Sequence, residues 1–239
     1  MKVLHHKFTG LQEIVLLTED DGSLSLYIDG YHQFNSNFEK VYHTCLYSLP
    51  ALYPKKLKKV LVLGGGDGLG PRNLLHFPSI KRIDLVDFDE GIIDLAKSHP
   101  DMIKITENSM NNKKVKIYAE DAKKYISQFN LFTKYDLIIT DFPDPTSAEL
   151  WTLFSKPFFK KLKTWLSKDG VLAIQASDKG VKSKKILKNV GESFSHVHGY
   201  ECDKSIECFF IMAMDKKSGK QREIPIQEKG VINKKRGAM

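Results

Sequence analysis

The stretch from residue 60 to 89, VLVLGGGDGLGPRNLLHFPSIKRIDLVDFD, constrains the fold more than any other part of the chain. It begins with the apolar run Val60 to Leu63, which is typical of a strand buried on both faces, and continues into the glycine-rich loop 64–68. Glycines there, Gly64 and Gly66 among them, let the backbone turn tightly and approach a ligand closely. The pattern predicts a nucleotide or nucleoside site at the end of a buried strand.

Two acids in this stretch narrow the choice of ligand. A helix is expected from about Pro71, and the second apolar run, Ile83 to Val86, ends at Asp87. Asp87 follows the glycines by about 20 residues, where ribose hydroxyls are usually bound. Asp67 lies inside the glycine loop and would repel a pyrophosphate, by roughly 4 kcal/mol at 4 Å with an effective dielectric near 20. We therefore expect a nucleoside that carries positive charge.

The order of the expected elements predicts an α/β fold. Residues 8–34 favour β structure with a turn at 20–23, and residues 37–49 favour a helix that ends at Pro50. Beyond them strands alternate with helices, which predicts a doubly wound, mainly parallel sheet. The expected strands are residues 60–63, 83–86, 115–118, 135–140, 171–176 and 208–214, and the expected later helices are 90–98, 119–129, 157–166 and 183–194. We expect a small β-rich domain with a connecting helix at 1–50, a nucleoside-binding domain at 51–214 and a basic tail at 215–239.

Charge and composition limit the partners. The formal net charge is +8, but residues 215–239 hold eight Lys or Arg against three acids, so the tail accounts for about +5 of it. The loops that carry functional residue types are acidic, and we expect no nucleic-acid partner. No apolar run approaches the roughly 18 residues of a membrane span, and the first residues form no secretory signal. The three cysteines match neither a disulfide framework nor a zinc site, which favours a cytoplasmic protein without a metal.

Several acids follow expected strands. They are Asp67, Asp87, Asp121, Asp141 and Asp144. Ligands of doubly wound sheets lie beyond the carboxyl ends of the strands, so these carboxylates are expected at one edge. The two prolines of the loop 141–145, DFPDP, stiffen it and can fix the separation of its two carboxylates. Such a loop suits a ligand that carries several ammonium groups.

These motifs resemble the spermidine synthase family of polyamine aminopropyltransferases. The resemblance rests mainly on GGGDG at 64–68 and DFPDP at 141–145. IDGYHQ at 28–33 and VYHTCL at 41–46 are similar to the family's LDG..Q and YHEML segments, in the same order. The resemblance extends to about Met214 and implies a Rossmann-like, methyltransferase-type domain preceded by a small β domain.

The resemblance also implies the residues of the site. The nucleoside cosubstrate, decarboxylated S-adenosylmethionine, would be bound by Gln12, Gln33, His43, Gly64, Gly66, Asp67, Asp87 and Asp121, and the amine acceptor by Tyr42, Asp144 and Gln175. Asp141 lies at the position of the family's proposed general base. A tightly bound cofactor and a metal are not implied, and a homodimer is expected.

The sequence departs from the family at several positions. Thr44 and Asp87 each replace a Glu, and Phe142-Pro143 replace Ser-Ser. The family's PTYPSG segment is absent, and residues 201–206, ECDKSI, take its place. Its acceptor-site tyrosine therefore has no clear counterpart, although Tyr200 is near. We expect groups around this segment, including Glu201 and Asp203, to close the acceptor pocket.

The implied reaction moves an aminopropyl group from decarboxylated S-adenosylmethionine to putrescine, giving spermidine and methylthioadenosine. An S-adenosylmethionine-dependent methyltransferase shares the sheet, but such enzymes usually carry an acid just before the glycines, where this chain has Val62. Asp67 would also oppose the methionine carboxylate. A polyamine or nucleoside binder without catalytic activity is the third possibility.

Overall fold

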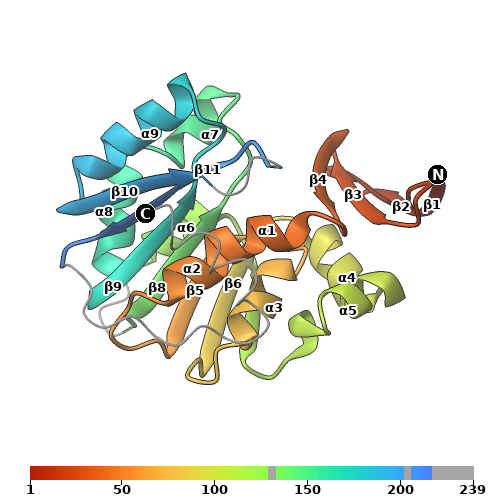
Figure 1. Ribbon diagram of the computed structural model, residues 1–239, viewed down its shortest axis with the longest axis horizontal. Helices are drawn as coiled ribbons and strands as arrows, with labels where there is room; N and C mark the ends of the chain where they lie inside the picture. Colours follow the sequence, from red (N-terminus) through yellow and green to blue (C-terminus); the bar gives the residue numbers. More distant parts are fainter. Residues whose placement is uncertain (129–132, 202–205, 217–239) are drawn as a thin grey trace.

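The computed structural model describes residues 1–128, 133–201 and 206–216, and most of the basic tail falls outside these ranges. Its strands form two sheets, one of four strands in the order β1-β2-β3-β4 and one of seven in the order β10-β11-β9-β8-β5-β6-β7. Figure 1 shows the small sheet at one end of the molecule, beyond α1 and α4. The α/β class with a small N-terminal sheet is confirmed.

The bounds of the strands follow the alternation of the sequence. The small sheet is an antiparallel meander of β1 (Lys2–Phe8), β2 (Glu13–Thr18), β3 (Leu24–Ile28) and β4 (Tyr31–Asn35). The parallel strands of the large sheet are β5 (Lys59–Gly64), β6 (Arg82–Asp87), β7 (Val115–Ala119), β8 (Tyr135–Asp141) and β9 (Leu166–Gln175). The antiparallel strands β10 (His196–Glu201) and β11 (Phe209–Met214) complete it at one edge.

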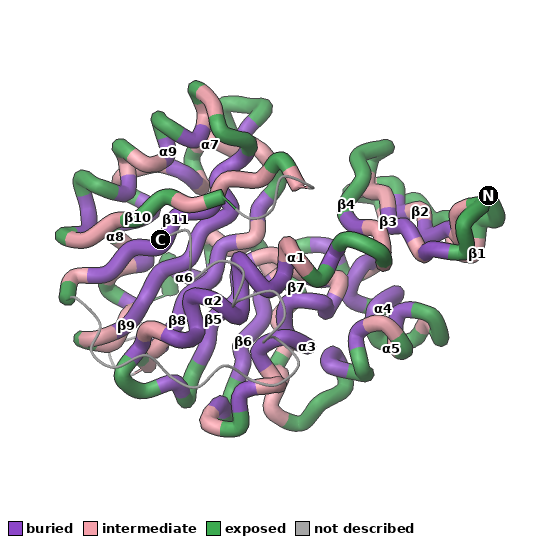
Figure 2. The backbone as a smooth tube through the Cα atoms, viewed as in Figure 1, coloured by how far each residue is buried: buried purple, intermediate pink, exposed green. Residues whose placement is uncertain are grey.

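Helices cover both faces of the large sheet. Those packed on the face of Val60 and Val62 are α1 (Glu39–His43), the π-helix η1 (Thr44–Ser48), α2 (Leu49–Ala51), α3 (Leu69–Leu75), α4 (Glu90–Ser98) and α5 (Pro100–Ile105), followed by the 3₁₀ turn η2 (Ser109–Asn111). The face of Leu61 and Leu63 is covered by α6 (Ala122–Ser127), α7 (Ala148–Thr152), α8 (Lys156–Trp165) and α9 (Val181–Gly191). The central strands β5, β6 and β8 are buried along their apolar runs and more exposed near their ends (Figure 2), as those runs predict.

Some local expectations were wrong. Pro50 does not end the first helix, because it lies in the first turn of α2, where its missing N–H is not needed. The short elements α5, α7 and β10 were not predicted, since their runs are too brief or too polar for a clear period. Cys45 is disulfide-bonded, whereas Cys208 is a free thiol. The expectation of no disulfide was therefore wrong at Cys45, because spacing in the sequence does not show which side chains meet in the fold.

In the described ranges no helix has the length and apolar composition that crossing a membrane requires.

Candidate functional site

The site is built where β5 and β8 end side by side. Gly64, the last residue of β5, pairs in register with Asp141, the last residue of β8. Gly64 has a φ of +86°, and a Cβ there would lie 2.1 Å from the Asp141 carbonyl oxygen. Only glycine can occupy this position, and the close approach places the Asp141 carboxylate directly beside the glycine loop.

Asp141 is bound by two tyrosines from the helical segment before β5. The Tyr42 hydroxyl donates to one carboxylate oxygen at 2.5 Å, and the Tyr47 hydroxyl donates to the other at 2.6 Å. Burial, with the Asp141 charge next in importance, raises the pKa of both tyrosines well above the usual value. Both therefore stay neutral donors near pH 7, and within this trio only the carboxylate can accept a proton.

Tyr47 was missed by the sequence analysis. It is fully buried, and Gly70 of α3 makes room for it, since a Cβ at Gly70 would lie 2.1 Å from its ring. Tyr42 and Tyr47 are five residues apart, a spacing that an α-helix places on different sides. The π-helix η1, which has i to i+5 hydrogen bonds and begins two residues after Tyr42, separates them in the chain, and both donate to Asp141. The i, i+5 pair of tyrosines was visible in the sequence, but the π-helix was not.

Asp67 lies in the glycine loop, within reach of the charges of His43 and Asp141. One of its carboxylate oxygens accepts the backbone N–H of Leu69 at 2.8 Å. Burial raises its pKa, the nearby positive charge of His43 opposes this effect, and Asp141 adds to it. A half-buried carboxylate next to other acids gains from an added ammonium, because the ammonium offsets both the burial and the repulsion.

A buried ion network lies behind these acids. Arg72 of α3 donates through both terminal nitrogens to the two carboxylate oxygens of Glu39, each at 2.8 Å. The Nδ1 of His43 lies 3.0 Å from Glu39 Oε2 and 2.8 Å from its carbonyl oxygen. Burial alone would lower the pKa of His43, but the bond to Glu39 and the charge of Asp67 raise it above the usual value. The network fixes α1 against α3 and thereby sets the direction of Tyr42.

Asp87, at the end of β6, contacts the backbone of the glycine loop through its carboxylate. It accepts the backbone N–H of Gly66 at 2.9 Å and that of Asp89 at 3.1 Å. Burial raises its pKa to about 6. Asp89 caps α4 through Gly91 and also accepts the Thr9 hydroxyl at 2.8 Å, which ties the small sheet to this corner.

The pKa of Asp87 predicts how nucleoside binding depends on pH. If Asp87 accepts ribose hydroxyls, as the sequence predicts, affinity should be fully present above the free-protein pKa of about 6 and fall as pH drops below it. We expect methylthioadenosine to bind several-fold more weakly at pH 5 than at pH 7, measured by calorimetry. The Asp87→Asn variant should bind more weakly at both values and lose this dependence. Equal affinity of the unaltered protein at the two values would contradict the assignment.

A second group of polar side chains lies at the ends of β8 and β9. Asp144 accepts the Gln175 amide at 3.2 Å and, through its other oxygen, the Ser177 hydroxyl and the Lys182 ammonium, the latter at 3.4 Å. Phe142 anchors the loop, because its ring is buried against Phe154 and Phe158. The loop 141–145, which departs from the family at Phe142, is thus held by these ring contacts as well as by the hydrogen bonds of Asp144.

A profile of the spermine/spermidine synthase domain matches residues 39–212 of this chain. The chain belongs to the spermine/spermidine synthase family. It is 38% identical over 192 residues to polyamine aminopropyltransferase 2 of Aquifex aeolicus, which covers 79% of this chain and 38% of the relative. It is 32% identical over 193 residues to polyamine aminopropyltransferase 2 of Bacillus cereus, covering 81% and 51%. The chain therefore spans 38% and 51% of the length of these two relatives.

Solved structures of this family share the fold. A spermidine synthase in complex with the transition state analogue AdoDATO has a TM-score of 0.83 at 23% identity, over 95% of this chain and 76% of that chain. The spermidine synthase of Thermotoga maritima has a TM-score of 0.81 at 23% identity, over 95% and 75%. The mainly parallel sheet with a small N-terminal sheet is thus the architecture of spermidine synthases.

Not every residue implied by the family resemblance lies among these acids. Gln12 is half-buried in the turn after β1, and Gln33 is exposed on β4 with its amide bonded to the Tyr31 carbonyl. Asp121 is exposed and caps α6 by accepting the Lys124 N–H at 2.8 Å. Among the described residues, no hydrogen bond joins these three side chains to Asp67, Asp87 or Asp141.

The expected closing segment is only partly described. The Tyr200 hydroxyl donates to the Cys45 carbonyl at 2.9 Å, and its ring stacks on Phe210, so it packs against the core. Glu201 is exposed and pairs with Lys179 at 2.7 Å. Asp203 lies outside the described residues. The expectation that this segment closes the acceptor pocket stays a prediction.

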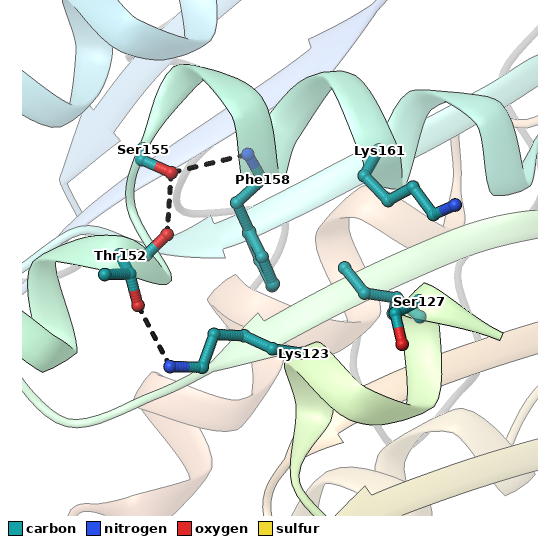
Figure 3. A pocket seen from close by; sticks show the side chains of 7 residues that line it. Lys123, Ser127, Thr152, Ser155, Phe158 and Lys161 are labelled. Carbon is teal, nitrogen blue, oxygen red and sulfur yellow. Dashed lines mark hydrogen bonds between the residues drawn. The ribbon is translucent and has the colours of Figure 1, made fainter.

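A cavity of about 300 Å³ lies elsewhere, between α6, α7 and α8, and is shown in Figure 3. Three of its lining residues are hydrogen-bonded to one another, with Lys123 donating to Thr152 at 3.2 Å and Ser155 donating to the Thr152 carbonyl at 2.7 Å. None of the acids at the strand ends lines it. Over the described chain no group of three or more His, Cys, Asp and Glu could bind a metal ion.

Proposed function

We propose that this chain transfers the aminopropyl group of decarboxylated S-adenosylmethionine to a small diamine, with putrescine as the acceptor. The observation that carries the proposal is the Asp141 carboxylate, bound by two neutral tyrosines and placed beside Asp67 in the glycine loop. A proton acceptor and a binding group for an ammonium thus occupy neighbouring positions at the edge where nucleosides bind.

Each group has a defined part in this reaction. Asp87 binds the ribose and Asp67 pairs with the ammonium of the aminopropyl group. The acceptor nitrogen, freed of a proton by Asp141, attacks the carbon next to the sulfonium; the new C–N bond forms as the C–S bond breaks, and the sulfur leaves as neutral methylthioadenosine. Asp144 and Gln175 face the far ammonium of the acceptor. Because the sulfonium already activates the carbon, the protein's task is placement and proton transfer.

The cosubstrate decides between this reaction and methyl transfer. Asp67 is expected to favour the decarboxylated form by at least ~10-fold, since one avoided charge clash of about 1.4 kcal/mol gives that ratio. Calorimetry with both forms measures the difference, and mass spectrometry of the amine after turnover shows whether an aminopropyl or a methyl group was added.

Two variants sharpen this comparison. Asp67→Asn should narrow the difference in affinity between the two forms of the cosubstrate, whereas Asp121→Asn, which replaces a group expected to bind the nucleoside they share, should weaken both equally. A wild-type preference for the carboxylated form together with methylated amine would establish the methyltransferase alternative. Nucleoside and amine binding without any product would establish the binder without activity.

A further inference from the structure

An ammonium of the protein itself lies at the carboxylate proposed to bind the acceptor. Lys182 Nζ is 3.4 Å from Asp144 Oδ2, the oxygen that also accepts the Ser177 hydroxyl. The two side chains are 42% and 32% exposed, so the pair is open to solvent and its lysine can move away. Asp144 is thus already partly neutralised before any amine arrives.

The position of Lys182 is unusual for a cation. It is the second residue of α9, which has 11 residues, and the N-terminus of a helix disfavours positive charge. Ser177, between this helix and β9, has a φ of +64°, a conformation that is uncommon for residues other than glycine. The connection between β9 and α9 therefore has two unfavourable features, the positive φ of Ser177 and the lysine at the helix N-terminus. Strained connections of this kind cluster at functional sites.

Gln175, next to Asp144, has a hydrogen-bond acceptor that no described group satisfies. The residue is 9% exposed, its amide nitrogen donates to Asp144, and its side-chain oxygen is buried with no hydrogen-bond partner in the described part of the chain. A buried acceptor without a donor is unfavourable and rare in folded proteins. Asp144 and Gln175 together thus offer acceptor oxygens to a ligand rich in N–H donors. Lys182 donates to Asp144 only and leaves the Gln175 oxygen unpaired among the described residues.

We propose that Lys182 is a specificity-determining residue, a tethered ammonium that the far ammonium of a diamine must displace from Asp144. The inference rests on the proposed function and adds a statement of which amine acceptors bind less well because of Lys182. The far ammonium of a diamine must compete with Lys182 for Asp144, and it is also repelled by the Lys182 ammonium. A monoamine of the same length has no far charge and does not compete with Lys182. The lysine therefore lowers the preference for diamines over monoamines.

The test compares putrescine with n-butylamine as acceptors. The readout is the ratio of their kcat/KM values in the wild type, Lys182→Met and the matched control Lys184→Met, which removes an exposed lysine two residues further along the same helix. Lys182→Met is expected to raise the ratio about 5-fold through a lower KM for putrescine, since an exposed ion pair accounts for at most about that factor. Lys184→Met and Lys182→Arg should leave it within about 2-fold. A ratio in Lys182→Met within 2-fold of the wild type, or below it, would overturn the proposal.

Binding without turnover separates this inference from the proposed function. Calorimetry of putrescine with protein saturated with methylthioadenosine measures the acceptor site directly. If the wild type yields no product with any amine, yet Lys182→Met binds putrescine several-fold more tightly than Lys184→Met does, the proposed reaction fails and the role of Lys182 stands. Equal binding by the two variants, or no binding by either, overturns the role of Lys182 whatever the activity.

Discussion

Replacing Asp141 by asparagine is expected to lower kcat for aminopropyl transfer by roughly 100-fold or more, the usual contribution of a positioned general base. An amide can still accept one tyrosine hydroxyl, so the shape of the site is kept, but it cannot take a proton from the acceptor ammonium. The tyrosines cannot replace it, because Tyr42 and Tyr47 have raised pKa values through burial and are themselves donors. Steady-state kinetics with saturating cosubstrate measure the effect.

The matched variant for this experiment is Asp144→Asn. Asp144 lies three residues further along the same loop and bonds Gln175 and Lys182, not the tyrosines. Its loss should raise KM for the diamine with a much smaller change in kcat. Methylthioadenosine should bind both variants as it binds the wild type, and circular dichroism checks their folding. A kcat near the wild-type value in Asp141→Asn would assign the proton to solvent or to another residue.

The centre of the large sheet was predictable because β5, β6 and β8 contain apolar runs and end in glycine or acid. The run 60–63 lies within β5, and the expected helix 90–98 coincides with α4. Prediction failed where tertiary contacts decide the structure. The expected helix 37–49 is interrupted by the π-helix η1, and two tyrosines of this segment donate to Asp141. Such a contact spans more than 90 residues of sequence and leaves no local period.

The candidate site was predictable in part for a related reason. Asp67, Asp87 and Asp141 end or follow strands, so strand order alone brings them to one edge. Tyr47 and Lys182 reach the same edge from helices, where direction depends on the helix type and on the length of the preceding loop. Both look in sequence like ordinary core or surface residues.

Replacing Arg72 by methionine is expected to destabilise the protein by about 3 to 5 kcal/mol, the usual cost of leaving a buried charge without its partner. The Arg72 side chain is 5% exposed and that of Glu39 1%, so water cannot solvate the remaining carboxylate. Urea unfolding at pH 7 measures the change. Lys156→Met is the matched control, because it breaks an ion pair with Glu192 whose side chains are 43% and 39% exposed, and should cost less than about 1 kcal/mol.

The pH dependence of stability tests the same network through the pKa of Glu39. Burial alone would raise the pKa of Glu39, but the bonds from His43 and Arg72 lower it from 4.5 to about 2. A carboxyl with a lowered folded pKa contributes stability that is present above 4.5 and is lost as pH falls toward about 2, here on the order of 3 kcal/mol. Glu39→Gln should be less stable at pH 7 and lack this part of the acid loss. An Arg72→Met cost below 1 kcal/mol, with an unchanged acid limb in Glu39→Gln, would mean that His43 and the backbone alone compensate Glu39, and that Arg72 orients α3 without holding the charge.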